Sequence, residues 1–183
     1  MNISDHYLYH IYPKKMRGDV LLPMNRLKSD HPDLFAHYVE TYKDRTHVLE
    51  RNIPILNCLW NDVIHTTNVC PRAFFNALKY AGRDPIPDIA WLKIPLRLAT
   101  MNPCVVYSCR TTTESRKIIP DNEIAPFDLS KFRSGHLDQR TIEYYKEQVG
   151  KAQRVLLFQG VAHFLIYGEI DISECEIVSW IES

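Results

Sequence analysis

The sequence lacks an excess of either charge, a glycine-rich phosphate-binding loop and a long hydrophobic run, and each absence excludes a class of protein. Its 22 Lys and Arg balance its 22 Asp and Glu, so no net field marks a polyanionic partner, although a local basic face stays possible. Neither GxxxxGK[ST] nor GxGxxG occurs, which argues against phosphate binding by a glycine-rich turn. No apolar segment approaches the roughly 20 residues needed to span a bilayer, and the first residues lack a signal-peptide pattern. We therefore expect a soluble, cytoplasmic protein without a membrane partner.

Metal-binding and protease motifs are also missing. The five cysteines are odd in number and contain no CxxC pair, so a zinc ribbon is not expected and a complete disulfide framework is impossible. HExxH and HxH do not occur, and we predict no metal site. GxSxG is absent, and no cysteine lies in a protease signature. The cysteines are predicted to be free thiols in a reducing compartment.

What the sequence does contain is an ordinary globular composition with strand-like and helix-like segments in alternation. A chain of 183 residues with 45% hydrophobic residues is long enough for one core, and no repeat or low-complexity linker suggests a second unit. We predict a single domain over residues 1–183. The segment pattern predicts an α+β fold with mixed or antiparallel sheets and interspersed helices.

The expected elements follow from hydrophobic periodicity and from proline and glycine punctuation. Strands are predicted at 7–13, at 53–60 and 62–67 (as one or two strands), at 89–96, at 104–110, and at 154–172 and 175–180 (as two or three strands). Helices are predicted at 29–52, at 71–82 with Pro71 opening the helix and Gly82 closing it, and at 137–152. Residues 110–136 are expected to form a long surface loop with local turns.

Three of the eight histidines lie inside strand-like runs, and these are the candidates for function. They are His10 in "YLYHIYP", His65 in "DVIHTT" and His163 in "GVAHFLI". Imidazole titrates near neutrality, which suits proton transfer, but a hydrogen-bonded core histidine is an equally good interpretation of each position. "HTT" and "HFL" also half-resemble the paired H-x-[ST] elements of two-histidine phosphoesterases, although the second lacks the hydroxyl.

The segment "YKDRTHVLERNIPILNCLWNDVIHTT" places polar side chains within an apolar run. Arg45 and Arg51 stand near the end of a predicted helix, where an arginine can bind a phosphate or carboxylate bidentately. The alternative is a solvated helix face, with the arginines paired to Asp44 and Glu50. Asn61 and Asp62 follow inside the apolar run, and a buried Asn or Asp must be hydrogen-bonded, either to the fold or to a ligand.

In this order the segments resemble the DarT-like branch of the ADP-ribosyltransferase fold. "LYHIYP" with "MRGDVLLPM" is similar to the opening strand of that family, and "RTHVLERNIPILNCLWNDVIH" is similar to its arginine-bearing segment. "NVCPRAFFNAL" and "KAQRVLLFQGVAHFLIYGEIDI" resemble the following proline-containing segment and the late strand pair. The resemblance covers most of the chain and implies an ADP-ribosyltransferase-like domain that takes NAD as substrate.

The resemblance also implies roles for particular residues. His10 would bind the nicotinamide ribose, Arg51 or Arg45 would contact phosphate or assist catalysis, and Asn61 and Asp62 would orient the ligand or the arginine segment. The position of the family's catalytic glutamate reads Gln153, which can hydrogen-bond ribose hydroxyls but cannot act as a base. The candidate catalytic residues are therefore Arg51, Gln153 and His65, and the candidate NAD-binding residues are His10, Arg45, Asn61 and Asp62.

Three functions remain open from the sequence. The first is an NAD-dependent ADP-ribosyltransferase that modifies a nucleic acid or a protein. The second is a non-catalytic module of the same fold that binds a nucleotide or single-stranded nucleic acid, with Tyr9, Tyr12, Trp60 and Trp91 as stacking candidates. The third is a two-histidine phosphodiesterase that uses His65 and His163.

Overall fold

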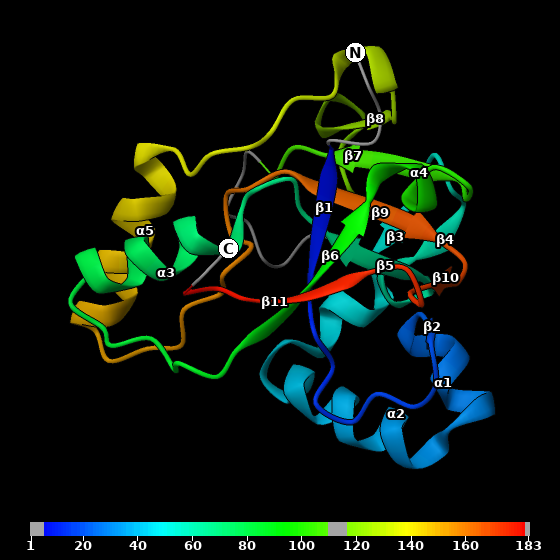
Figure 1. Cartoon of the computed structure of the whole chain (residues 1–183), viewed down its shortest axis with the longest axis horizontal. Coiled ribbons are helices and arrows are strands. Elements are labelled where there is room, and N and C mark those ends of the chain that lie inside the picture. Colours follow the sequence, from blue (N-terminus) through cyan, green and yellow to red (C-terminus); the bar gives the residue numbers. More distant parts are fainter. Residues whose placement is uncertain (1–5, 110–116, 182–183) are drawn as a thin grey trace.

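Two antiparallel sheets form the body of the fold (Figure 1). The computed structural model describes residues 6–109 and 117–181. One sheet has the order β1-β6-β11 and the other the order β5-β9-β7-β8. Their strands are β1 (Tyr7–Ile11), β5 (Val63–Thr66), β6 (Ala90–Pro95), β7 (Cys104–Tyr107), β8 (Ile124–Pro126), β9 (His163–Tyr167) and β11 (Glu176–Ser179). Two short antiparallel ribbons pair β2 (Val20–Leu21) with β10 (Ile170–Asp171) and β3 (Asn52–Ile53) with β4 (Cys58–Leu59). The predicted α+β class with antiparallel sheets is confirmed.

The two sheets are joined where β1 passes β5. The Tyr9 amide donates to the Thr67 carbonyl at 2.7 Å, and the Thr67 amide donates back to Tyr9 at 3.0 Å. This pair of bonds fixes the edge of one sheet against the edge of the other. Residues that follow Tyr9 and precede Thr67 therefore lie close together, although more than 50 positions separate them in the sequence.

The four-stranded sheet has one face toward the three-stranded sheet and one face toward the site. Successive side chains of a strand point to opposite faces. Phe164 and Ile166 of β9 belong to the cluster shared with Leu8 of β1, whereas Leu165 packs with Val105 of β7 on the other face. Across neighbouring strands, His65 lies opposite Leu165, and Tyr107 lies opposite His163. Consequently His65, Tyr107 and His163 share the face opposite the main core.

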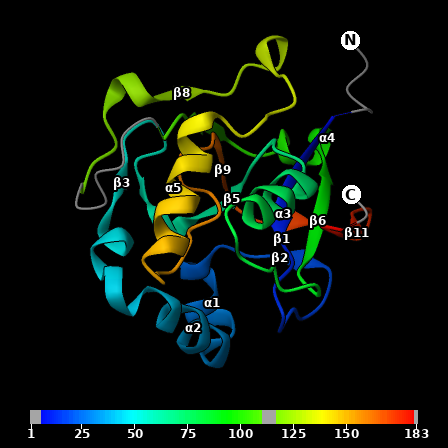
Figure 2. The same ribbon diagram turned by 90° about the vertical axis from the view of Figure 1, so that its left-hand side faces the viewer.

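The helices cover the sheets in two groups, as the views of Figures 1 and 2 show. The α-helices are α1 (Met24–Asp30), α2 (Pro32–Val39), α3 (Pro71–Tyr80), α4 (Leu96–Ala99) and α5 (Gln139–Gly150), and the 3₁₀ segments are η2 (Glu40–Glu50), η3 (Trp60–Asp62), η4 (Asp121–Glu123) and η5 (Leu129–Lys131). Helices α3 and α5 pack together over Trp91 and Trp180, while α1 and α2 lie beside the β2 strand. No helix within residues 6–109 and 117–181 combines the length and the apolar character that crossing a membrane requires.

The boundaries of two helices follow the predicted signals. Pro71 is the first residue of α3, and Gly82 follows its end with φ +87°, a conformation that glycine adopts without strain. Asp138 caps α5, because its carboxylate accepts the Thr141 amide at 2.9 Å.

The predicted helix over residues 29–52 is wrong in its second half. An α-helix runs only from Pro32 to Val39, and the chain then continues as 3₁₀ turns with a non-helical residue, Arg45, at φ −150° and ψ 45°. Residues 40–50 carry few apolar side chains, so they lack a continuous stripe that would stabilise an α-helix by packing. The kink at Arg45 divides the segment where it borders the site.

The strand predicted to begin at Arg154 is also wrong, because residues 154–162 are irregular chain with a turn at 157–160, and β9 begins only at His163. Val155, Leu157 and Phe158 are apolar because they pack on the α3–α5 cluster, not because they pair in a sheet. Gly160 adopts φ +78°, which turns the chain into β9. The late strand pair that the resemblance implies is therefore a loop in its first half.

Smaller differences concern short elements. Helix α1 was not predicted. The expected strand over 53–60 is divided between β3 and β4, which pair with each other, and its last residue begins the η3 turn. The expected loop over 110–136 contains β8, which pairs with β7, while residues 110–116 of that loop lie outside the described residues. Strands of two or three residues carry too little periodicity to be recognised.

Candidate functional site

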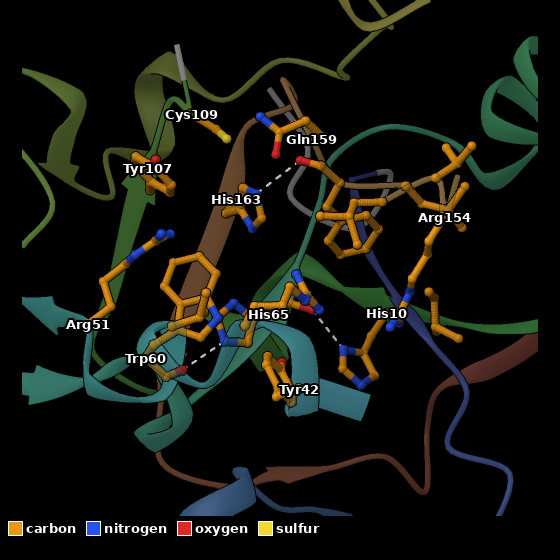
Figure 3. A pocket seen from close by; sticks show the side chains of 17 residues that line it. His10, Tyr42, Arg51, Trp60, His65, Tyr107, Cys109, Arg154, Gln159 and His163 are labelled. Atoms are coloured by element: carbon orange, nitrogen blue, oxygen red, sulfur yellow. Dashed lines mark hydrogen bonds between the residues drawn. The ribbon is translucent and has the colours of Figure 1, made fainter. Parts of the chain in front are cut away.

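A cavity of about 440 Å³ lies on the sheet face that carries His65, Tyr107 and His163. We call it the arginine pocket (Figure 3). It is bordered by β1, by the η2 turns, by the start of β5 and by the turns at 154–159. Its lining residues are His10, Ile11, Tyr42, Arg45, Val48, Arg51, Trp60, His65, Tyr107, Cys109, Arg154, Val155, Leu156, Leu157, Phe158, Gln159 and His163.

Two of its walls are built by similar short segments. Residues 59–65 read "LWNDVIH" and residues 157–163 read "LFQGVAH". In both, the histidine Nε2 lies within hydrogen-bond distance of the backbone carbonyl of the aromatic residue five positions earlier: His65 to Trp60 at 2.8 Å and His163 to Phe158 at 3.0 Å. A carbonyl only accepts, so Nε2 carries the proton and Nδ1 is left as the acceptor in both rings. The sequence prediction of no repeat missed this pair of segments.

The two imidazoles are held neutral. Burial lowers the pKa of His65 to about 3 and that of His163 to about 4, and the positive charge of Arg51 acts in the same direction on both. Burial also lowers the pKa of His10, whose Nδ1 donates to the His65 carbonyl at 2.7 Å. At neutral pH the three rings therefore offer lone pairs and no charge.

Arginines supply the charge of the pocket. Arg51 is 9% exposed and lies over the Trp60 ring, with its guanidinium carbon 5.0 Å from the ring centroid. Arg45 lies at the same distance from the Tyr42 ring. Arg154 reaches across from the opposite wall and donates to the Thr41 carbonyl at 3.1 Å. Figure 3 shows Arg51 and Arg154 on opposite sides of the pocket. Guanidinium groups stacked on rings are preorganised to bind anions bidentately.

Aromatic rings surround His163 at the inner end of the pocket. The centroids of Trp60, Tyr107 and Phe158 lie 5.6, 5.6 and 5.7 Å from that of His163. Cys109 is buried beside Tyr107 with φ +48°, and burial raises the pKa of its thiol. A thiol in this state is a poor nucleophile, so we assign Cys109 to packing.

The structure brings four of the seven predicted site residues together. Arg51, His65, His10 and Arg45 all line the arginine pocket. Gln153 does not line it and is exposed in the chain that follows α5.

Asn61 and Asp62 also lie outside the lining of the pocket. The Asn61 amide donates to Asn25 Oδ1 at 2.5 Å, and Asp62 accepts the Asn25 amide at 2.5 Å and the Leu59 backbone amide at 2.8 Å. These bonds attach α1 to the η3 turn, which places the Trp60 carbonyl under His65.

Several lining residues were not among the predicted site residues. Arg154, Phe158 and Gln159 lie on the segment predicted to be a strand, Tyr107 lies on the strand predicted over 104–110, and Tyr42 lies in the helix predicted over 29–52. The repeated segment could have identified two of them, since Phe158 holds the place of Trp60 and Gln159 that of Asn61.

The protonation states of His65 and His163 limit the reactions that the pocket could catalyse. The His65 and His163 ring centroids are 6.2 Å apart, close enough to act on one ligand. Cleavage of a phosphodiester by two histidines needs one of them protonated as the acid, and both are neutral here. Among the described residues no group of three or more His, Cys, Asp and Glu could hold a metal ion. The pocket is thus suited to an anion with an attached ring.

Comparison with protein-family models, with curated protein sequences and with solved structures gives no match for this chain.

Proposed function

We propose that the arginine pocket binds NAD and that the chain is an ADP-ribosyltransferase-like protein. The observation that carries the proposal is the lining itself: three arginines and four aromatic rings, with no aspartate or glutamate among the described residues that line it. NAD combines two phosphates with two flat rings, so it matches both properties. The resemblance of the sequence to DarT-like proteins supports the same ligand independently.

The residues fit the parts of NAD. Arg51 and Arg154, on opposite walls, would hold the pyrophosphate between them, because guanidinium groups bind phosphate oxygens bidentately. The rings of Trp60, Tyr107 and Phe158 would face a base or the nicotinamide. A cavity of about 440 Å³ lies within the usual size of small-molecule sites, which is about 300–1,000 Å³.

NAD supplies an ADP-ribosyl group that is activated by its cationic nicotinamide leaving group. The chain's own contribution would be to orient that group and to exclude water. His10 and His65 present neutral nitrogen acceptors to hydroxyl groups. Gln159 can both donate and accept a hydrogen bond, but it carries no charge.

A second candidate is an NAD-binding module without turnover. It is favoured by the absence of a carboxylate among the described lining residues, since a carboxylate is the usual group that stabilises developing positive charge on a ribose. Binding and turnover must therefore be measured separately.

The experiment is calorimetric titration with NAD and with ADP-ribose, followed by a chromatographic assay for released nicotinamide. We expect binding of both ligands, weakened about tenfold or more in Arg154→Ala, because one charge-assisted contact contributes about 1.5–3 kcal/mol. Arg140→Ala is the matched control, since Arg140 is exposed, pairs with Asp138 and lies outside the pocket. Released nicotinamide supports the transferase, and binding without release supports the module. No binding of either ligand by the wild type refutes both.

A further inference from the structure

A second cavity, of about 370 Å³, lies between α1, α2 and the chain around β2. We call it the aliphatic cavity. Its inner residues Leu21, Leu34, Val63 and Ile64 are at most 4% exposed, and Leu27 of α1 also lines it. It shares His10, Ile11, Tyr42 and His65 with the arginine pocket, so the two cavities adjoin at these four residues.

The mouth of this cavity is basic. Lys14 and Lys15 line it, both are exposed, and neither forms an ion pair with any described residue. Arg17 also lines it, but its guanidinium is bound by the Asp33 carboxylate at 2.6 and 3.2 Å. None of the described lining residues is an aspartate or a glutamate. Two lysines thus line a space whose most buried wall residues are aliphatic, although tyrosines and histidines line it as well.

Such an arrangement has a specific chemical complement. Aliphatic walls favour a flexible hydrocarbon chain, and each buried methylene contributes to binding. The lysines favour a negative head group that remains in water at the mouth. Tyr12, Tyr38 and Tyr42 also line the cavity and could stack on a nucleobase, so a nucleic acid is the competing ligand in the test.

We propose that the aliphatic cavity binds a medium-chain carboxylate, with its hydrocarbon chain against Leu21, Leu34 and Ile64 and its head group at Lys14 and Lys15. This site goes beyond the proposed NAD function and does not depend on it. Because the two cavities share a wall, a ligand in one contacts residues that line the other. Binding in the two spaces is therefore expected to be coupled reciprocally where NAD binds.

The test is titration of the full chain with hexanoate, octanoate and decanoate below the concentration of micelle formation. Calorimetry gives the affinity, and methyl NMR spectra identify the site. We expect the affinity to rise about 15-fold for each two methylenes, and the shifts to fall on Leu21, Leu27 and Leu34 and not on Leu157 of the arginine pocket. An affinity independent of chain length, or shifts confined to Leu157, overturns the proposal.

Three variants examine the two ends of the ligand. Leu27→Trp fills the cavity from α1 and should abolish binding of decanoate, with circular dichroism showing that the variant is folded. The double variant Lys14→Glu/Lys15→Glu should lower the affinity for decanoate about fivefold at low salt and leave the affinity for decanol unchanged. Lys28→Glu, an exposed residue outside both cavities, is the control and should have no effect. If the double variant loses affinity for decanol and for decanoate equally, the assignment of the head group to the lysines is refuted. Tighter binding of a short oligonucleotide than of decanoate, lost in Leu27→Trp, refutes the assignment of the ligand.

Discussion

The rings of His65 and His163 meet edge to face, with centroids 6.2 Å apart and an interplanar angle of 88°. Each is fixed by a bond from its Nε2 to the carbonyl of an aromatic residue five positions earlier. Two antiparallel strands, β5 and β9, bring these similar segments to the same face of the sheet. The backbone carbonyls therefore fix the tautomer of both rings, while burial keeps both rings neutral.

The neutral state predicts how stability depends on pH. The folded pKa of His163 is lowered from 6.5 to about 4, so below pH 6.5 the unfolded chain binds a proton that the folded chain does not. Stability from this group is fully present above pH 6.5 and is lost as the pH falls toward 4, by up to about 1.4 kcal/mol per pH unit. We expect His163→Gln to reduce the slope of unfolding free energy against pH by about that amount between pH 6 and 4.5. Urea denaturation at several pH values measures it.

His136→Gln serves as the control for this experiment, because His136 is exposed and lies outside both cavities. It controls for the exchange of a histidine for a glutamine at a site away from the pocket. If His163→Gln has the same slope as the wild type, His163 is not held neutral by the fold.

Arg51 predicts a second effect on the same rings. Its charge lowers the pKa of both His65 and His163. Arg51→Gln removes the charge, so the pKa of both imidazoles should rise. NMR titration of the ring carbons follows each histidine separately. Arg45→Gln is a suitable comparison, because it removes the same charge from another position in the same pocket. Unchanged pKa values in Arg51→Gln would contradict the electrostatic coupling.

Part of the fold could be predicted because local signals agreed with the tertiary structure. Pro71 and Gly82 bound α3 as expected, and the apolar run at 104–107 forms a buried strand. The turns at 154–162 could not be predicted, because Val155, Leu157 and Phe158 have the composition of a strand. Their burial against α3 and α5 is a long-range contact that periodicity does not encode.

The residues of the candidate site could also be predicted only in part. His10, Arg45, Arg51 and His65 were identified from residue type and position, and they do share one cavity. Gln153 was placed by analogy with a strand, so when the strand proved to be a turn the side chain fell outside. Arg154, the next residue, lines the pocket instead.

Asp62 offers a test of whether the polar residues of the η3 turn bind a ligand or hold the fold. Its carboxylate accepts from Asn25 and from the Leu59 amide, and it lines neither cavity. We expect Asp62→Ala to lower the free energy of unfolding by about 1–3 kcal/mol, since two donors lose their partner. NAD affinity at a temperature where the variant is folded should stay within about twofold, as for a site that Asp62 does not touch. Titration calorimetry and thermal denaturation on the same sample distinguish the two roles. A large loss of affinity with unchanged stability would place Asp62 at the ligand.

Two glutamines on either side of the 154–158 turn give the final prediction. Gln159 lines the arginine pocket, and Gln153 is exposed outside it. Gln159→Glu introduces the carboxylate that the described lining lacks, so its negative charge should stabilise developing positive charge on a ribose and raise the rate of nicotinamide release from NAD. The same charge should weaken ground-state binding of the pyrophosphate.

Gln153→Glu is the control, because it makes the same change in charge at a solvent-exposed position. It should alter neither the rate of nicotinamide release nor the affinity for NAD by more than about twofold, because water and salt screen an exposed charge. Release of nicotinamide by both variants is compared at saturating NAD. An increase in Gln153→Glu without one in Gln159→Glu would mean that the catalytic position lies at residue 153, outside the arginine pocket.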